Sequence, residues 1–146
     1  RSSIAEVHGL IRKIEDIKDL AGRSIKNGAP AIETASIQRR IVEAETRIEA
    51  MRLNGLRFLT QQLKGEPLGS ETSVNKLLRA KLEVELGELG LEILGSDAEI
   101  REGEGTLDGG SWQTFALNWP EVVIGGGTPN IQKNIIAERI LGLPKD

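Results

Sequence analysis

The stretch IQRRIVEAETRIEAMRLNGLRF, from Ile37 to Phe58, decides the fold of this chain. Its apolar and small residues recur at alternating intervals of four and three, which is the spacing of one face of an α-helix. They are Ile37, Ile41, Ala44, Ile48, Met51, Gly55 and Phe58. A face this long and narrow predicts a long helix packed against neighbouring helices. We expect it to end near Lys64, before the turn GEPLGS at 65–70.

The segments on either side of this helix also have helical periodicity. Residues 3–20 carry an apolar stripe, and the glycine, asparagine and proline residues of 22–30 then predict a loop. Ser70 and Glu71 suit the start of a third helix, which we expect to run to about Gly95. The stripes consist of Ile4, Val7, Ile11 and Ile14 in the first helix, and of Val74, Leu78, Leu82, Leu86, Leu89 and Ile93 in the third.

Residues 96–125 have a different composition. The sequence EGEGTLDGGS at 102–111 is rich in glycine and acidic residues, so we expect an exposed loop. A group of large apolar residues follows it. This group either packs a short helix onto the rest of the fold or stacks against a ligand, and we favour packing. Its members are Trp112, Phe115, Leu117 and Trp119.

The last helix has a recognisable start and end. Thr128 is a natural N-cap, and Pro129 suits the first helical position because the missing N–H would have no helical partner there. Gly142 can adopt the left-handed conformation that ends a helix, and Pro144 prevents continuation. We expect an apolar face made of Ile131, Ile135, Ile136 and Ile140. Four helices with short links and no strand pattern predict an all-α fold, an antiparallel up-and-down four-helix bundle in one domain.

Composition excludes several classes of function. The net charge of -3 is spread over mixed acidic and basic residues, which argues against a nucleic-acid-binding surface. There is no cysteine, and His8 is the only histidine, so disulfides, thiol chemistry and a histidine-based triad are excluded. No apolar run approaches the roughly 20 residues of a membrane span, and we expect a cytoplasmic protein. The chain begins at Arg1 inside a helical pattern, from which we expect that 1–146 is a fragment of a longer protein.

Few residues are candidates for chemistry. The glycines Gly125–Gly127 lead into the last helix, and such a loop either binds an anion through bare amides or is simply a tight turn before a cap. It is not a P-loop, because no Walker lysine follows. Lys76 either pairs with a carboxylate or faces water, and His8 is a packing or surface residue. Acidic pairs two residues apart, such as Glu83 and Glu85, do not share a helix face, so we expect solvated surface.

The final stretch VIGGGTPNIQKNIIAERILGLPKD, at 123–146, resembles the C-terminus of acyl-CoA dehydrogenases. These flavoenzymes introduce a 2,3-double bond into acyl-CoA thioesters. RSSIAEV at 1–7 and SVNKLLRAKLEVELGELGLEILG at 73–95 also resemble parts of the family's C-terminal helical domain. The resemblance implies FAD as cofactor, acyl-CoA as substrate, and a homo- or hetero-oligomer in which this bundle forms a subunit interface. It also implies an electron-transfer flavoprotein as partner, and a fragment that is inactive alone.

The resemblance further implies that Gly127, Thr128 and Asn130 contact the flavin nucleotide. Two other FAD-contacting elements of the family are altered here. The Gln-x-x-Gly-Gly stretch is matched by Glu92, Gly95 and Ser96, and the Arg-x-x-Phe-Gly motif has no clear counterpart in GRSIKNGAP at 22–30.

The position of the catalytic base is open. Many family members place a glutamate directly before the Gly-Thr pair, where this chain has Gly126. Other members place it on the first helix of this domain, at a position that would immediately precede Arg1, and Glu6 is an outside candidate on the same helix. A third solution has no base in this subunit. That solution implies a non-catalytic assembly subunit, or helical interaction module, beside a catalytic partner.

Overall fold

A computed structural model describes residues 3–70, 72–103 and 106–145. Arg1 and Glu71 lie outside the described residues, as does the side chain of Ile4. Within the described ranges, no helix is both long and apolar enough to cross a membrane. The α-helices are α1 (Ser3–Arg23), α2 (Ala35–Leu63), α3 (Thr72–Leu94), α4 (Ser111–Leu117), α5 (Trp119–Ile124) and α6 (Pro129–Ile135).

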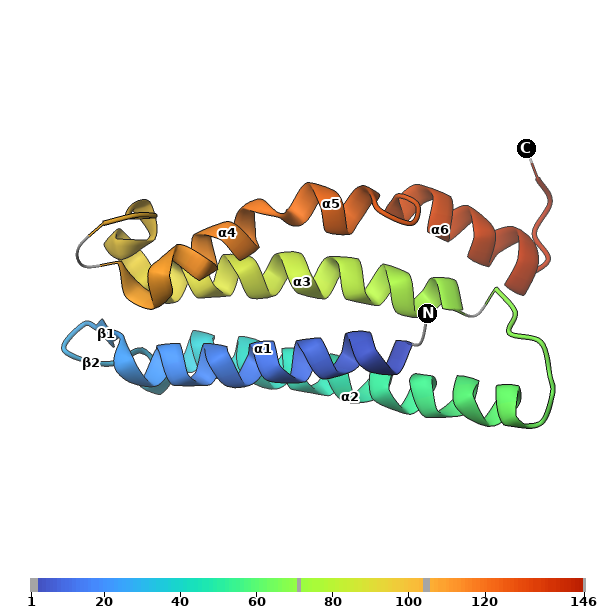
Figure 1. Cartoon of the computed structure of the whole chain (residues 1–146), viewed down its shortest axis with the longest axis horizontal. Coiled ribbons are helices and arrows are strands. Elements are labelled where there is room, and N and C mark those ends of the chain that lie inside the picture. The colour runs from blue at the N-terminus through green and yellow to red at the C-terminus, as the bar shows by residue number, and fades with distance from the viewer. Residues whose placement is uncertain (1–2, 71, 104–105, 146) are drawn as a thin grey trace.

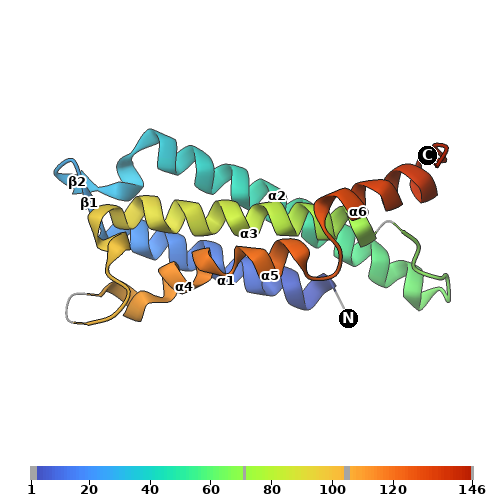
Figure 2. The same ribbon diagram turned by 90° about the horizontal axis from the view of Figure 1, so that it is seen from above.

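These elements form the antiparallel bundle that the sequence predicts. In Figure 1, α1, α2 and α3 run alternately in opposite directions, and α4, α5 and α6 together return along α3. The fourth position of the bundle is therefore filled by three short helices instead of one. Figure 2 shows that α3 lies between α2 on one side and α4 and α5 on the other. The central helix is thus covered on several sides, which explains why its apolar residues are not confined to one stripe.

The core confirms the pattern that decided the fold. All seven residues of the predicted α2 stripe are buried. On α3, the predicted residues from Leu82 to Ile93 are buried, and two glycines on another face are buried as well. A Cβ added to Gly87 would lie 2.9 Å from the Cα atom of Ala116, and one added to Gly90 would lie 2.6 Å from Cε3 of Trp112. These glycines let α4 approach the α3 backbone closely.

The loop predicted at 22–30 is a small hairpin, which corrects the expectation of no strand. Helix α1 continues to Arg23, and strands β1 (Ile25–Lys26) and β2 (Ala29–Pro30) pair antiparallel. Asn27 and Gly28 between them have φ of 55° and 84°. Positive φ at both central residues is the requirement of a type I′ hairpin turn, which an Asn-Gly pair meets at little cost. A 3-10 turn, Ala31–Glu33, then leads into α2.

In the acidic segment, Glu102, Gly103, Asp108 and Gly109 are exposed, as expected, but residues 106–111 are also anchored to the bundle. It contains a 3-10 turn, Leu107–Gly110, and Gly110 is buried. The Asp108 carboxylate accepts hydrogen bonds from Arg23 Nη2 at 3.1 Å and from Trp112 Nε1 at 3.0 Å. Burial acts to raise the pKa of Asp108, but these two donors outweigh it and hold the pKa below its ordinary value. The segment therefore links α1 to α4.

Exposed apolar residues correct two further expectations. Trp112 is buried and Phe115 packs against the core, as the packing interpretation requires, whereas Leu117 and Trp119 are 63% and 51% exposed. The expected apolar face of the last helix is also open, since Ile131 is 52% exposed. The buried residue of α6 is instead Gln132. After α6 the chain makes a π-helical turn, Ile136–Ile140, and ends it at Gly142 with φ of 66°, as predicted.

Candidate functional site

The glycine loop before α6 has the geometry of a helix start. Gly126 and Gly127 have φ of 73° and 102°, in the left-handed region that favours glycine. Thr128 then has extended backbone, and its Oγ1 accepts a hydrogen bond from Ile131 N at 3.4 Å. Pro129 occupies the first helical turn. The structure thus confirms the predicted cap, and the positive φ at Gly126 would strain the backbone of a glutamate placed there.

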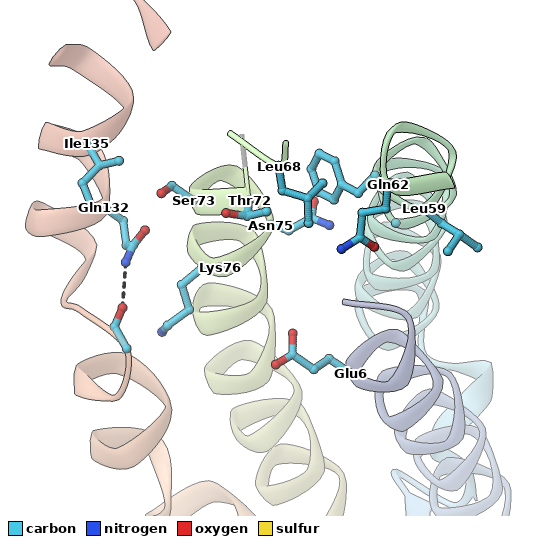
Figure 3. Close-up of a pocket in the computed structure, with 13 residues that line it drawn as sticks. Glu6, Leu59, Gln62, Leu68, Thr72, Ser73, Asn75, Lys76, Gln132 and Ile135 are labelled. Carbon is cyan, nitrogen blue, oxygen red and sulfur yellow. Dashed lines mark hydrogen bonds between the residues drawn. The ribbon is translucent and has the colours of Figure 1, made fainter. Parts of the chain in front are cut away.

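A buried glutamine holds this loop in place. Gln132 is 6% exposed, and its Nε2 donates a hydrogen bond to Gly126 O at 2.8 Å, drawn as the dashed line in Figure 3. A Cβ on Gly127 would lie 2.8 Å from the same nitrogen, so the loop backbone and the Gln132 side chain fit closely. Sequence reasoning identified Gln132 only as part of a motif. No signal in the sequence distinguishes Gln132 from its polar neighbours Lys133 and Asn134.

Several amides of the loop remain available for a ligand. Among the described residues, no acceptor is bonded to the backbone N–H groups of Gly126, Thr128 and Asn130. The Asn130 side chain is exposed beside them. Unpaired amides at the start of a helix, where the helix dipole is positive, attract an anionic group. Of the three predicted nucleotide-contacting residues, Thr128 and Asn130 therefore have free amides, whereas the Gly127 N–H donates to Ile124 O at 3.1 Å.

Lys76 lies beneath the loop. Its Nζ donates to Val122 O at 2.8 Å, and a Cβ on Gly126 would lie 3.4 Å from its Cε. Burial lowers the pKa of Lys76, and the positive charge of Arg79 lowers it further. Within the described residues, no carboxylate lies within 4 Å of the Lys76 ammonium. Lys76 therefore pairs with no carboxylate among the described residues, and its side chain is partly buried instead of facing water.

Glu6, the outside candidate for a base, is held in an ion pair. Its Oε1 lies 2.6 Å from Nη1 of Arg79, whose Nε also donates to Glu83 Oε1 at 2.6 Å. The side chain of Glu83 is only 14% exposed, which corrects the expectation of a solvated surface for that residue. His8 is exposed on α1, as expected.

Glu6, Lys76 and Gln132 share a cleft with Gly126. The cleft has a volume of about 410 Å³ and lies at the end of the bundle where α3 begins. Figure 3 shows the Lys76 side chain pointing from α3 toward the loop before α6, with Glu6 on the other side of α3 and Gln62 on α2. Apolar side chains complete its wall. They are Phe58, Leu59, Leu68 and Ile135.

The two altered FAD-contacting elements meet at the other end of the bundle. Glu92 pairs with Lys26 Nζ at 3.4 Å and with Arg40 Nη1 at 2.5 Å. Lys26 belongs to the hairpin, so an ion-pair cluster joins the end of α3 to the segment 22–30. Gly95 has φ of 59° and, with Ser96, begins a 3-10 turn. Sequence reasoning noted both departures separately but did not place them in contact.

Comparison with known proteins identifies the family. Residues 1–141 match the family model of the acyl-CoA dehydrogenase C-terminal domain. The chain therefore belongs to the acyl-CoA dehydrogenase family and corresponds to its C-terminal domain, as the tail sequence predicts.

Relatives and solved structures agree with this assignment. The chain is 33% identical over 135 residues to acyl-CoA dehydrogenase IpdE1 of Mycobacterium tuberculosis, covering 92% of this chain and 32% of that protein. It is 35% identical to IpdE1 of Mycolicibacterium smegmatis, covering 80% of this chain and 28% of that protein. The chain thus spans about a third of the length of these curated relatives.

Two solved structures extend the comparison. The fold is shared with the crystal structure of the ChsE4–ChsE5 complex from Mycobacterium tuberculosis, with a TM-score of 0.82, 22% identity, and coverage of 100% of this chain and 38% of that chain. The FAD complex of PigA matches with a TM-score of 0.74 and 27% identity, and covers 94% of this chain and 34% of that chain. The all-α architecture is therefore that of a known family domain.

Proposed function

We propose that the full-length protein is an FAD-dependent acyl-CoA dehydrogenase, which catalyses α,β-dehydrogenation of acyl-CoA thioesters. In this proposal the domain contributes cofactor contacts and part of a subunit interface. The observation that carries it is the glycine loop at 125–127, which leads into a capped helix and leaves three amides without acceptors among the described residues. Family membership supports the same assignment. The lack of cysteine is compatible with the cytoplasm, where we place the protein.

The donors at this loop fit an anionic nucleotide. Thr128 and Asn130 would hold it through their backbone N–H groups and the exposed Asn130 side chain, and Gly127, whose N–H donates to Ile124 O at 3.1 Å, would lie against it. The tight fit of Gln132 against Gly127 keeps the loop in one conformation. When bound, FAD supplies an acceptor for the hydride that leaves the acyl β-carbon. The Glu92 end fits the cofactor poorly, because an ionised carboxylate has no N–H donor for a nucleotide phosphate, and Glu92 engages the cations Lys26 and Arg40.

Proton abstraction is the step for which neither of the two candidate positions, Gly126 and Glu6, offers a free carboxylate. Gly126 has no side chain, and Glu6 is paired with Arg79 at 2.6 Å. A general base needs a carboxylate that can reach and take the substrate proton. We therefore propose that Glu6 positions Arg79, and that the base lies elsewhere in the full-length protein or in a partner subunit. Substituting Glu6→Gln should leave the rate of flavin reduction within about threefold, whereas loss of a true base costs at least a hundredfold.

The second candidate function is a non-catalytic assembly subunit beside a catalytic partner. The observation that favours it is again Gly126, whose position in many relatives holds the glutamate. A chain of the ChsE4–ChsE5 complex, which consists of two different proteins, shares this fold. Exposed apolar side chains on α2 support an oligomer of like or unlike subunits, since they have no cover in the single chain. These are Leu53, Leu56, Leu59 and Leu63.

Flavin bleaching distinguishes the two functions. The full-length protein, loaded with FAD, is mixed anaerobically with acyl-CoA, first alone and then with any co-purifying partner. A catalytic subunit should bleach the flavin and yield a 2-enoyl-CoA, and reoxidation by an electron-transfer flavoprotein should follow. Bleaching only in the presence of the partner would support the assembly role. No bleaching under either condition, with FAD bound and a range of acyl chain lengths tested, would refute the dehydrogenase proposal.

A further inference from the structure

The cleft beside the glycine loop has a polar part in addition to its apolar wall. Lys76, Gln132, Asn75 and Glu6 all line it. A saturated chain cannot hydrogen-bond to such groups, and covering polar groups without replacing their hydrogen bonds with water is unfavourable. The opposite wall is apolar, with Phe58 only 6% exposed. The cleft therefore suits a ligand that has a carbon skeleton and also an oxygen-bearing group.

The distribution of charge identifies that group. Lys76 uses one donor on Val122 O, which leaves two N–H donors of its ammonium. In the part of the chain that the structure describes, no carboxylate lies within 4 Å of it, although Glu6 and Glu83 both pair with Arg79. Lys76 is thus a partly buried cation whose nearby acids are engaged elsewhere. An anionic group of a ligand would restore the interactions that its burial removes.

The same charges favour a carboxylate over a phosphate. The Glu6–Arg79–Glu83 chain carries one net negative charge, and Glu6 lines the same cleft as Lys76. A phosphate monoester carries nearly two negative charges, so a single lysine would neutralise it incompletely and the acidic chain would repel it. A carboxylate carries one charge and can accept both remaining N–H groups. Its carbon skeleton can lie against Phe58, Leu59 and Ile135.

We propose that this cleft binds acyl-CoA thioesters whose acyl group carries a second carboxylate, and that Lys76 pairs with that carboxylate. The inference rests on the proposed dehydrogenase function, because it names the substrate class of that enzyme. Lys76 is then a specificity-determining residue of the binding site. It lies on α3, a rigid central helix, which fixes the position of the ammonium relative to the glycine loop.

The test compares two thioesters of equal carbon number, adipyl-CoA and hexanoyl-CoA, on the full-length protein with its partner subunit. Binding is measured by calorimetry and turnover by flavin bleaching, for the native protein and for Lys76→Met and Lys76→Arg. Lys81→Met is the matched control, since Lys81 is on the same helix with its side chain 71% exposed. Thermal unfolding of each variant shows that it is folded.

Lys76→Met should bind adipyl-CoA about tenfold or more weakly than the native protein does. Its affinity for hexanoyl-CoA should differ from that of the native protein by less than about threefold. Lys76→Arg should keep part of the preference, and Lys81→Met all of it. Equal affinity of the native protein for both thioesters, or equal loss on both in Lys76→Met, would overturn the inference. Stronger competition by inorganic phosphate than by adipate would also overturn it, in favour of a phosphate site.

The binding and turnover measurements separate this inference from the proposed function. A Lys76-dependent preference for adipyl-CoA without any bleaching would support the carboxylate site and count against the dehydrogenase. Flavin bleaching without a preference for adipyl-CoA would support the dehydrogenase and count against the carboxylate site.

Discussion

Replacing Gln132 by leucine should loosen the glycine loop while leaving the bundle folded. Gln132 is buried and makes one hydrogen bond, from Nε2 to Gly126 O. Leucine has a similar volume and fills the same space, so the change removes the tether without opening a large cavity. Because Gly126 is exposed, a water molecule can donate a hydrogen bond to its carbonyl oxygen in place of Gln132. The effect on global stability should therefore be small and the effect on the loop larger.

The magnitudes follow from the structure. One neutral hydrogen bond contributes about 1 kcal/mol to stability, which corresponds to a fall in Tm of about 3 °C for a domain of this size. Fixing the backbone of one residue costs about 1–2 kcal/mol. In Gln132→Leu, FAD binding must fix the backbone of one loop residue that the native protein already holds in place. The variant should therefore bind FAD about tenfold more weakly than the native protein.

A second buried glutamine provides the control. Gln113 is 5% exposed, and its Nε2 donates to Asp97 O at 3.2 Å and to Ile100 O at 3.0 Å, at the opposite end of the bundle. Gln113→Leu loses two hydrogen bonds, so it should lower the free energy of unfolding by about 2 kcal/mol and leave FAD affinity unchanged.

The assay pairs a thermal melt with a flavin fluorescence titration on the full-length protein. Gln132→Leu should have the smaller Tm shift and the larger loss of FAD affinity, and Gln113→Leu the reverse. Equal loss of FAD affinity in both variants, or an unchanged affinity in Gln132→Leu, would refute the role of the tether.

Three other changes test the packing and the electrostatics. Thr128→Val removes the helix cap and should cost about 1 kcal/mol in chemical denaturation, whereas Thr128→Ser should be nearly neutral. Gly90→Ala places a Cβ 2.6 Å from the Trp112 ring and should destabilise the domain by about 1–3 kcal/mol. The control Gly9→Ala, which meets nothing within 4 Å inside α1, should instead stabilise it, and equal effects would contradict the packing argument. Because the pKa of Asp108 is lower in the folded protein, its stabilising effect is complete above the unfolded value near 3.8 and is lost as pH falls through the folded value. Melts between neutral and acidic pH should therefore show a steeper loss for the native protein than for Asp108→Asn, and parallel curves would contradict this.

The elements that depend on local rules could be predicted from the sequence. The stripe from Ile37 to Phe58 predicted a buried face that the structure confirms residue by residue, because helical periodicity needs no knowledge of the partner surface. The cap at Thr128 and the termination at Gly142 were also predictable, since both depend on backbone conformation within a few residues. The tail motif predicted the family, which the comparison confirms.

The contacts between side chains depend on how the helices pack. The ion pairs of Glu6 with Arg79 and of Lys26 with Glu92 join residues that are far apart in the sequence. The helical periodicity of the sequence does not predict such pairs. Burial of Gln132 in place of Ile131 on α6 could not be predicted from polarity, because it depends on the Gly126 carbonyl nearby. Lys76 became a candidate for ligand binding only when its surroundings were known. Local sequence specifies helices and their ends, whereas the partners of a charged or amide side chain are set by the packing of whole helices.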